Sequence, residues 1–168
     1  MEEQREVLAR TVAAVMRPAP VTVDIGETVL VAWELLQRSG SRHLPVVHPD
    51  GRCAGLLDRA DVAVACAAPA VSLSAVRVGD LLRGHGRALV HAEQSVRHAV
   101  DLMAYTEADA LPVLAGDGRL AGVLTATDIV AALVGHPVRE GPADRRPQAP
   151  TTLPGLPPRR DYRGTAVP

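Results

Sequence analysis

Two hydroxyls and a carboxylate lie within four residues of one another in the segment Gly122-Val-Leu-Thr-Ala-Thr-Asp128. Thr125, Thr127 and Asp128 open a predicted helix directly after a predicted strand. A helix N-terminus presents unpaired N–H groups and the positive end of the helix dipole, which favours a phosphate group. We expect Thr125, helped by Thr127, to contact a phosphate oxygen. The Asp128 carboxylate is suited to accept hydrogen bonds from the two hydroxyls of a ribose.

The same residues also fit a purely structural role. Thr125 followed three residues later by Asp128 is a capping box, in which the threonine caps the helix and the acid bonds back to the cap. Asp58-Arg-Ala-Asp61 has the same spacing earlier in the chain. A capping box alone explains this spacing, so the two interpretations stay open at this point.

These two segments belong to an internal repeat with an offset of 67 residues. Residues 43–62 align with residues 110–129, and ten of the twenty positions are identical. The alignment extends upstream, where Glu27-Thr-Val29 lies over Gln94-Ser-Val96. The chain therefore contains two copies of one supersecondary unit.

Each copy has the pattern of β-α-β-β-α. Short strands are predicted at 21–23 and 88–90, followed by helices that begin after the N-cap candidates Thr28 and Ser95. Two further strands flank an Asp-Gly turn in each copy, at 44–47 and 53–57 and at 111–114 and 120–124. A closing helix follows Asp58 or Thr125. We therefore predict an α/β (α+β) fold in which the two repeats pack around a pseudo-two-fold axis.

The domain boundaries follow from this pattern. We expect a leading helix within residues 1–17, with its apolar side chains over 5–16, then a first repeat over 18–67. A linker over 68–77 and a second repeat over 78–134 follow. Residues 135–168 contain 8 prolines in 34 residues and paired arginines, so we expect a disordered or polyproline-like tail. A partner-binding segment is the alternative for this tail.

Leu-Pro-Val, then Asp-Gly, then Gly122-Val-Leu-Thr-Ala-Thr-Asp128 resembles the CBS (cystathionine β-synthase) domain family. The resemblance covers about residues 12–134. It implies a two-repeat regulatory module with two clefts between the repeats, which commonly bind AMP, ADP, ATP or S-adenosylmethionine. It assigns Thr125 and Thr127 to phosphate and Asp128 to ribose. The adenine would then lie in an apolar slot near Leu89, Ala110 and Leu111.

The first copy departs from the family pattern at Asp58, where a threonine is expected. A carboxylate at this position repels phosphate unless a cation bridges the two. Asp61 keeps the acid that the family places at the ribose, so the first site suits a neutral or cationic adenosine compound such as S-adenosylmethionine. We predict one phosphate-competent site, in the second repeat, and one degenerate site.

Arg42 and His43 precede the first Leu-Pro-Val segment. In a nucleotide-sensing member of the family, a His–Arg pair at these two positions reaches phosphate, whereas here the order is reversed. Arg42 and His43 are therefore ligand-binding candidates, with a surface arginine and a half-buried strand histidine as the alternatives. The second copy has Asp109-Ala110 instead, with no basic side chain.

The sequence shows no motif for metal binding or catalysis. His48, His85, His91, His98 and His136 have no metal-ligand spacing, and we expect no metal site. Cys53 and Cys66 are expected to be buried reduced thiols, with a regulatory disulfide as the alternative. We see no catalytic nucleophile or acid–base pair and no catalytic cofactor is implied, so we expect the chain not to be an enzyme.

Composition limits the partners further. The formal net charge is −1, so neither nucleic acid nor an anionic membrane is favoured as a partner. The N-terminus shows no signal peptide and no apolar stretch is long enough to span a bilayer, so we expect a cytoplasmic protein.

Two hypotheses for function remain. The first is a ligand sensor that signals to an unknown regulated protein, and the second is an interaction scaffold with empty clefts. We expect a homodimer in either case, because the apolar segments 7–15 and 76–82 would leave surface that needs a partner.

Overall fold

The computed structural model describes residues 1–18, 20–67, 75–83 and 88–136. Most of the predicted linker over 68–77 and nearly all of the predicted tail over 135–168 lie outside these ranges. Among the helices of the described ranges, none is both long and apolar enough to cross a lipid bilayer.

Both repeats have the predicted β-α-β-β-α order. The first consists of β2 (Val23–Asp24), α2 (Val29–Ser39), β3 (His43–Val47), β4 (Cys53–Asp58) and α3 (Arg59–Cys66). The second consists of β5 (Val90–His91), α6 (Val96–Thr106), β6 (Ala110–Leu114), β7 (Leu120–Thr125) and α7 (Ala126–Leu133). Both predicted N-caps are confirmed, because the Thr28 hydroxyl accepts from the Val31 N–H and the Ser95 hydroxyl accepts from the His98 N–H.

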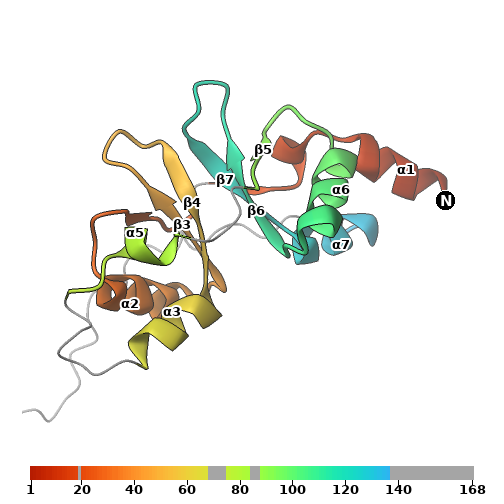
Figure 1. Cartoon of the computed structure of the whole chain (residues 1–168). Coiled ribbons are helices and arrows are strands. Elements are labelled where there is room, and N and C mark those ends of the chain that lie inside the picture. The colour runs from red at the N-terminus through yellow and green to blue at the C-terminus, as the bar shows by residue number, and fades with distance from the viewer. Residues whose placement is uncertain (19, 68–74, 84–87, 137–168) are drawn as a thin grey trace, which may run out of the picture.

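The sheets follow from this order. In each repeat the first strand pairs in parallel with the second, and the second pairs antiparallel with the third. The Asp-Gly turns connect the antiparallel pairs, with φ of 83° at Gly51 and 80° at Gly118, a backbone region that glycine adopts without strain. The two hairpins lie side by side in Figure 1, and the backbones of Arg52 and Arg119 form an isolated antiparallel β-bridge between them.

The leading segment differs from its prediction. Instead of one helix over 5–16, α1 (Glu2–Ala9) ends early and a short 3-10 helix, η1 (Val12–Ala14), follows. Between them Thr11 is extended and bridges Ser95 in the second repeat. The pairing with a distant element therefore interrupts what the periodicity alone predicts as a continuous helix.

The two repeats exchange the segments that precede them. Before the first repeat, β1 (Arg17–Pro18) joins the sheet of the second as its edge strand, in the order β1-β7-β6-β5. Upstream of β1, the Val12 N–H donates to the Gln94 carbonyl. In the equivalent place before the second repeat, the Val78 N–H donates to the Glu27 carbonyl, and α5 (Val78–Leu81) lies on the first repeat. Figure 1 shows α1 beside α6 and α7, and α5 beside α2.

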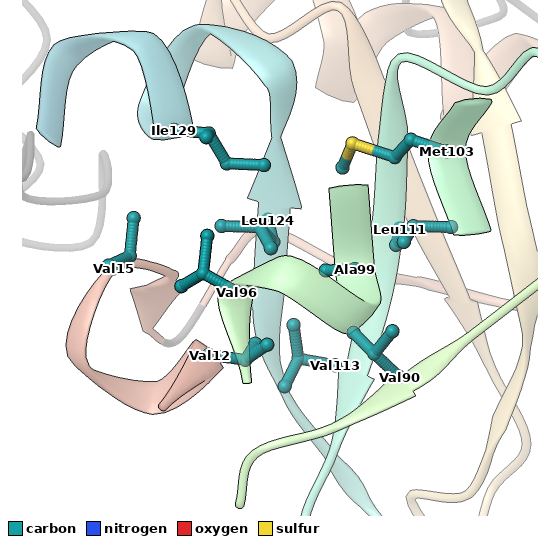
Figure 2. Packing of buried hydrophobic residues seen from close by; sticks show 10 residues of the cluster. All are labelled: Val12, Val15, Val90, Val96, Ala99, Met103, Leu111, Val113, Leu124 and Ile129. Atoms are coloured by element: carbon teal, nitrogen blue, oxygen red, sulfur yellow. The ribbon is translucent and has the colours of Figure 1, made fainter. Parts of the chain in front are cut away.

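Each core is closed by its exchanged segment. Val12 and Val15 pack into the core of the second repeat, whose buried side chains Figure 2 shows around Leu111 and Leu124. Val78 is buried in the core of the first repeat. The prediction that segments 7–15 and 76–82 present an apolar surface to a partner is therefore wrong, because their main apolar side chains are buried within the chain itself.

Each third strand has a glycine where the exchanged segment touches it. A Cβ built on Gly122 would lie 2.4 Å from the backbone oxygen of Arg17, and one on Gly55 would lie 2.9 Å from the Cδ2 atom of Leu82. Gly122 thus allows β1 to approach β7, which is a packing role. The first contact is with rigid backbone, whereas the second is with the end of a flexible side chain.

Gly122→Ala is expected to lower the free energy of unfolding by about 1–3 kcal/mol, the usual cost of overpacking. Gly55→Ala is the matched control and should cost less, because Leu82 can move. Urea unfolding of the two variants measures both values. An equal or smaller loss for Gly122→Ala would show that the β1 backbone does not require a glycine opposite it.

Candidate functional site

The candidate residues lie at two equivalent strand-to-helix junctions. In the first repeat β4 ends at Asp58, which pairs across the strands with His43. In the second repeat β7 ends at Thr125, which pairs with Ala110. The repeated register therefore places Asp58 and Thr125 in equivalent positions, each at the start of a closing helix.

Asp128 is buried and its carboxylate is fully engaged. One oxygen accepts from the Thr125 N–H at 3.0 Å and from the Thr125 hydroxyl at 2.6 Å. The other accepts from the Arg17 Nε–H at 2.8 Å, in an ion pair where the Asp128 side chain is 4% exposed. The Asp128 N–H in turn donates to the Thr125 hydroxyl, so the capping box is present. A ribose would have to displace Arg17 to reach this carboxylate.

Three other residues of the predicted second site do not converge on a common cavity. Thr127 is exposed on α7, and Leu111 is fully buried in the core. Gly122 is covered by β1. Within the described ranges, none of the three lines either of the two clefts between the repeats.

The smaller cleft lies beside Thr125 and has a volume of about 40 Å³. It is lined by residues of both repeats, namely Arg17, Pro20, Val21, Ser41, Arg42, His43, Val123 and Thr125. Because this volume holds little more than a water molecule, a nucleoside does not fit while Arg17 stays on Asp128. Two guanidinium groups make the lining basic.

The larger cleft lies beside Asp58 and Asp61 and has a volume of about 460 Å³. The first repeat contributes both acids with His43, His48, Cys53, Ala54, Gly55 and Leu56. The second repeat contributes Ala88, Leu89, Thr106, Glu107, Ala108, Asp109, Ala110 and Pro112. This volume lies in the range of small-molecule sites. Asp58 also caps α3, where its side chain accepts from the Ala60 N–H at 2.6 Å.

Leu89 and Ala110 are in a different cleft from the one predicted. The sequence-based prediction places them with Thr125 and Asp128 of the same repeat, but they line the larger cleft together with Asp58 and Asp61. The pseudo-two-fold arrangement explains the difference, because each cleft combines the strand-to-helix junction of one repeat with the first two strands of the other.

His43 and Arg42 lie between the two clefts. His43 lines both clefts, and Arg42 lines the smaller one. The His43 Nε2 atom lies 2.9 Å from Asp109 Oδ1 and 3.5 Å from Asp58 Oδ2. The Arg42 guanidinium lies 3.7 Å from the other Asp109 oxygen. Charged groups of the two repeats thus meet where equivalent loops face each other.

Both cysteines are free thiols, and Cys53 lines the larger cleft. Burial raises the pKa of the Cys53 thiol, although a hydrogen bond to the Gly55 carbonyl opposes the shift. Desolvation also raises the pKa of Cys66. At neutral pH both side chains are therefore protonated and poorly nucleophilic.

Two residues at these clefts, Arg17 and Asp109, are not among the site residues predicted from the sequence. Arg17 is 111 residues from Asp128 and falls in a segment predicted as helix, so no local signal identified it. Asp109 had a usable signal, because the repeat alignment places it opposite Arg42. Opposite charges at equivalent positions form an ion pair where both positions lie next to the two-fold axis, as Arg42 and Asp109 do.

Two curated proteins resemble the chain in sequence. A CBS domain-containing protein of Dictyostelium discoideum is 28% identical over 131 residues, which cover 73% of this chain and 90% of that protein. A homoserine O-acetyltransferase of Methanosarcina acetivorans is 28% identical over 120 residues, covering 71% of this chain. The chain spans only 21% of the length of that enzyme.

Three solved structures have the same fold. CBSX2 in complex with AMP is 27% identical with a TM-score of 0.64, covering 74% of this chain and 96% of that one. Hypoxic Response Protein I with two coordinated zinc ions is 23% identical with a TM-score of 0.64, covering 72% of this chain and 97% of that one. The CBS domain pair of MJ0100, in complex with 5′-methylthioadenosine and S-adenosylmethionine, is 21% identical with a TM-score of 0.64. The match covers 76% of this chain and 98% of that one.

The family match covers both repeats. A family model for the CBS domain matches residues 12–68 and again residues 87–135. Each match contains one β-α-β-β-α unit, and the two units enclose clefts built from both. The chain belongs to the CBS domain family, as a tandem pair of these domains.

Proposed function

We propose that this CBS pair is a regulatory module that binds an adenosine derivative without a phosphate group, such as S-adenosylmethionine, in its larger cleft. The observation that carries the proposal is the acidic cavity of about 460 Å³ between the repeats, with Asp58 and Asp61 among its lining residues. The CBS family is regulatory rather than catalytic, so bound ligand would act as a signal to another protein.

The shape of the larger cleft suits a nucleoside. Small-molecule sites of about 300–1,000 Å³ combine an apolar lining with a few polar groups that fix orientation. Here Ala54, Ala88, Leu89, Ala108 and Ala110 supply small apolar surfaces from both repeats. They are suited to the two faces of an adenine, and Asp61 is suited to accept from the ribose hydroxyls.

The charge of the larger cleft favours a cation over a phosphate. Four carboxylates line it, from Asp58, Asp61, Glu107 and Asp109, and no arginine is among its lining residues in the described ranges. Like charges in a partly desolvated site repel more strongly than in water. A sulfonium ion beside Asp58 would be attracted, whereas a phosphate in that place would be repelled.

The solved relatives support an adenosine compound as the ligand class. CBSX2 was solved with AMP, and the MJ0100 domain pair was solved with 5′-methylthioadenosine and S-adenosylmethionine. Those ligands have an adenosine group in common and differ in charge at the 5′ position. The residues at the strand-to-helix junction would select among such compounds in this chain.

The smaller cleft is the place for a phosphate-bearing nucleotide, which we propose as a second ligand. Arg17, Arg42 and Thr125 line it and suit a phosphate, as the family motif implies. Such a ligand would have to draw Arg17 away from Asp128, and so enlarge the cleft. The phosphate would then replace the carboxylate as the partner of the Arg17 guanidinium.

For the partner we propose a second copy or a regulated protein that docks on the closing helices. Val64 on α3 is 75% exposed and Val130 on α7 is 58% exposed, at roughly equivalent places in the two repeats. An interaction scaffold with empty clefts remains the alternative function. Calorimetric titration with adenosine compounds distinguishes the ligand-binding module from the scaffold, because a scaffold binds no adenosine compound.

Asp61→Asn is expected to weaken binding of S-adenosylmethionine about tenfold or more. Hydrogen bonds to a charged acceptor contribute about 1.5–3 kcal/mol, and about 1.4 kcal/mol corresponds to a factor of ten in affinity. Isothermal titration of the full chain with a chelator present measures the change. Asp101→Asn, an exposed site on α6, is the control and should bind as the unaltered chain does. Absence of binding at millimolar ligand would leave the scaffold as the function.

Asp58→Asn is expected to shift the preference of the larger cleft toward AMP. Removing the charge abolishes repulsion of the phosphate and attraction of the sulfonium. Asparagine caps helices as well as aspartate does, so α3 keeps its cap. The ratio of AMP affinity to S-adenosylmethionine affinity should rise at least severalfold in the same titration. An unchanged ratio would show that Asp58 does not face the 5′ group of the ligand.

Saturating S-adenosylmethionine is expected to slow alkylation of Cys53 severalfold and to leave Cys66 unchanged. Cys53 lines the larger cleft, and Cys66 is not among the lining residues there. Because burial raises both thiol pKa values, the reaction should speed up as pH rises and is best followed under mildly alkaline conditions. Mass spectrometry of labelled peptides reports each site. Equal protection of both cysteines would indicate general stabilisation instead of a ligand in this cleft.

A further inference from the structure

We propose that His43, Asp58 and Asp109 form a binding site for a divalent metal ion such as Zn²⁺, which would link the two repeats. Two of these residues come from opposite strands of the first repeat, β3 and β4, and the third from the loop before β6 of the second. The three residues are far apart in the sequence, so they do not form a recognisable metal-binding motif.

The donor atoms have the separations that a metal centre needs. His43 Nε2 lies 3.5 Å from Asp58 Oδ2 and 2.9 Å from Asp109 Oδ1, and all three atoms lie within 4.8 Å of one another. Ligands of tetrahedral zinc at bond lengths of about 2.0–2.1 Å are separated by about 3.3 Å. The two separations from His43 Nε2, 2.9 Å and 3.5 Å, lie on either side of this value.

Each carboxylate is oriented through its second oxygen. Asp58 Oδ1 accepts from the Ala60 N–H at 2.6 Å, which leaves Oδ2 on the side of His43. Asp109 Oδ2 faces the Arg42 guanidinium at 3.7 Å, which leaves Oδ1 toward His43. Partners of this kind fix the direction of metal ligands and tune their affinity. The His43 side chain is only 11% exposed, so its position is also restricted by packing.

The donor set indicates which metals fit. One imidazole nitrogen and two carboxylate oxygens suit zinc and similar transition metals, whereas Mg²⁺ and Ca²⁺ prefer oxygen ligands alone. Three protein ligands leave a fourth position open. Because all three residues line the larger cleft, that position faces the space assigned to the adenosine ligand. A bound cation would also offset the charge of two of the four carboxylates there.

The test is a titration of the metal-free full chain with Co²⁺, followed by its visible absorbance, and then displacement by Zn²⁺. We expect one equivalent of Zn²⁺ to bind with micromolar or tighter affinity. His43→Ala and Asp109→Asn should each weaken binding at least tenfold, since the loss of even an outer partner costs about 10–100-fold. Asp109 is half exposed, so its variant should fold normally even if His43→Ala does not.

His48→Ala is the matched control, because His48 lines the same cleft outside the cluster and its variant should bind zinc as the unaltered chain does. The proposal is overturned if no stoichiometric binding occurs below millimolar zinc, or if His48→Ala weakens binding as much as His43→Ala. In the first of those cases, His43 only forms a hydrogen bond with Asp109 and lies beside the Asp58 carboxylate. No adenosine compound is present in this titration, so it can fail independently of the proposed ligand function.

Discussion

Each repeat closes its core with a segment that precedes the other repeat in the chain. β1 adds an edge strand to β7, and α5 covers the first repeat, with a glycine in each case where the segments touch. A single β-α-β-β-α unit has too few elements to bury its own apolar face. The exchange makes the repeats mutually dependent, so their relative placement follows from core packing and not from the linker between them.

The two-fold relation that results places equivalent residues opposite each other, and the differences between the copies then determine the chemistry. Asp58 stands where the second copy has Thr125, and Asp109 stands where the first has Arg42. The larger cleft is consequently acidic and the smaller one basic, although both arise from the same backbone framework. The differences between the two repeats therefore place carboxylates on one cleft and guanidinium groups on the other, within the described residues.

Contacts between residues near in sequence predict the helices and strands, whereas packing between distant segments determines which residues line each cleft. Thr28, Ser95 and the Asp-Gly turns fix caps and hairpins through contacts within a few residues, so these could be read from the sequence. The early end of α1, the pairing of Arg17 with Asp128, and the assignment of Leu89 to the cleft of Asp61 all depend on residues more than twenty positions away. The cluster of His43, Asp58 and Asp109 has the same origin, and for that reason the sequence predicted no metal ligands.

His43 connects these features, because its side chain faces both clefts and contacts both repeats. A ligand changes a conformational equilibrium only by the difference in its affinity for the two states. Any molecule held in either cleft touches walls contributed by both repeats, so its affinity varies with their relative placement. A change in that placement would move α3 and α7 together with their exposed valines. The clefts are therefore connected to the surface proposed for a partner through the same packing that holds the two repeats together.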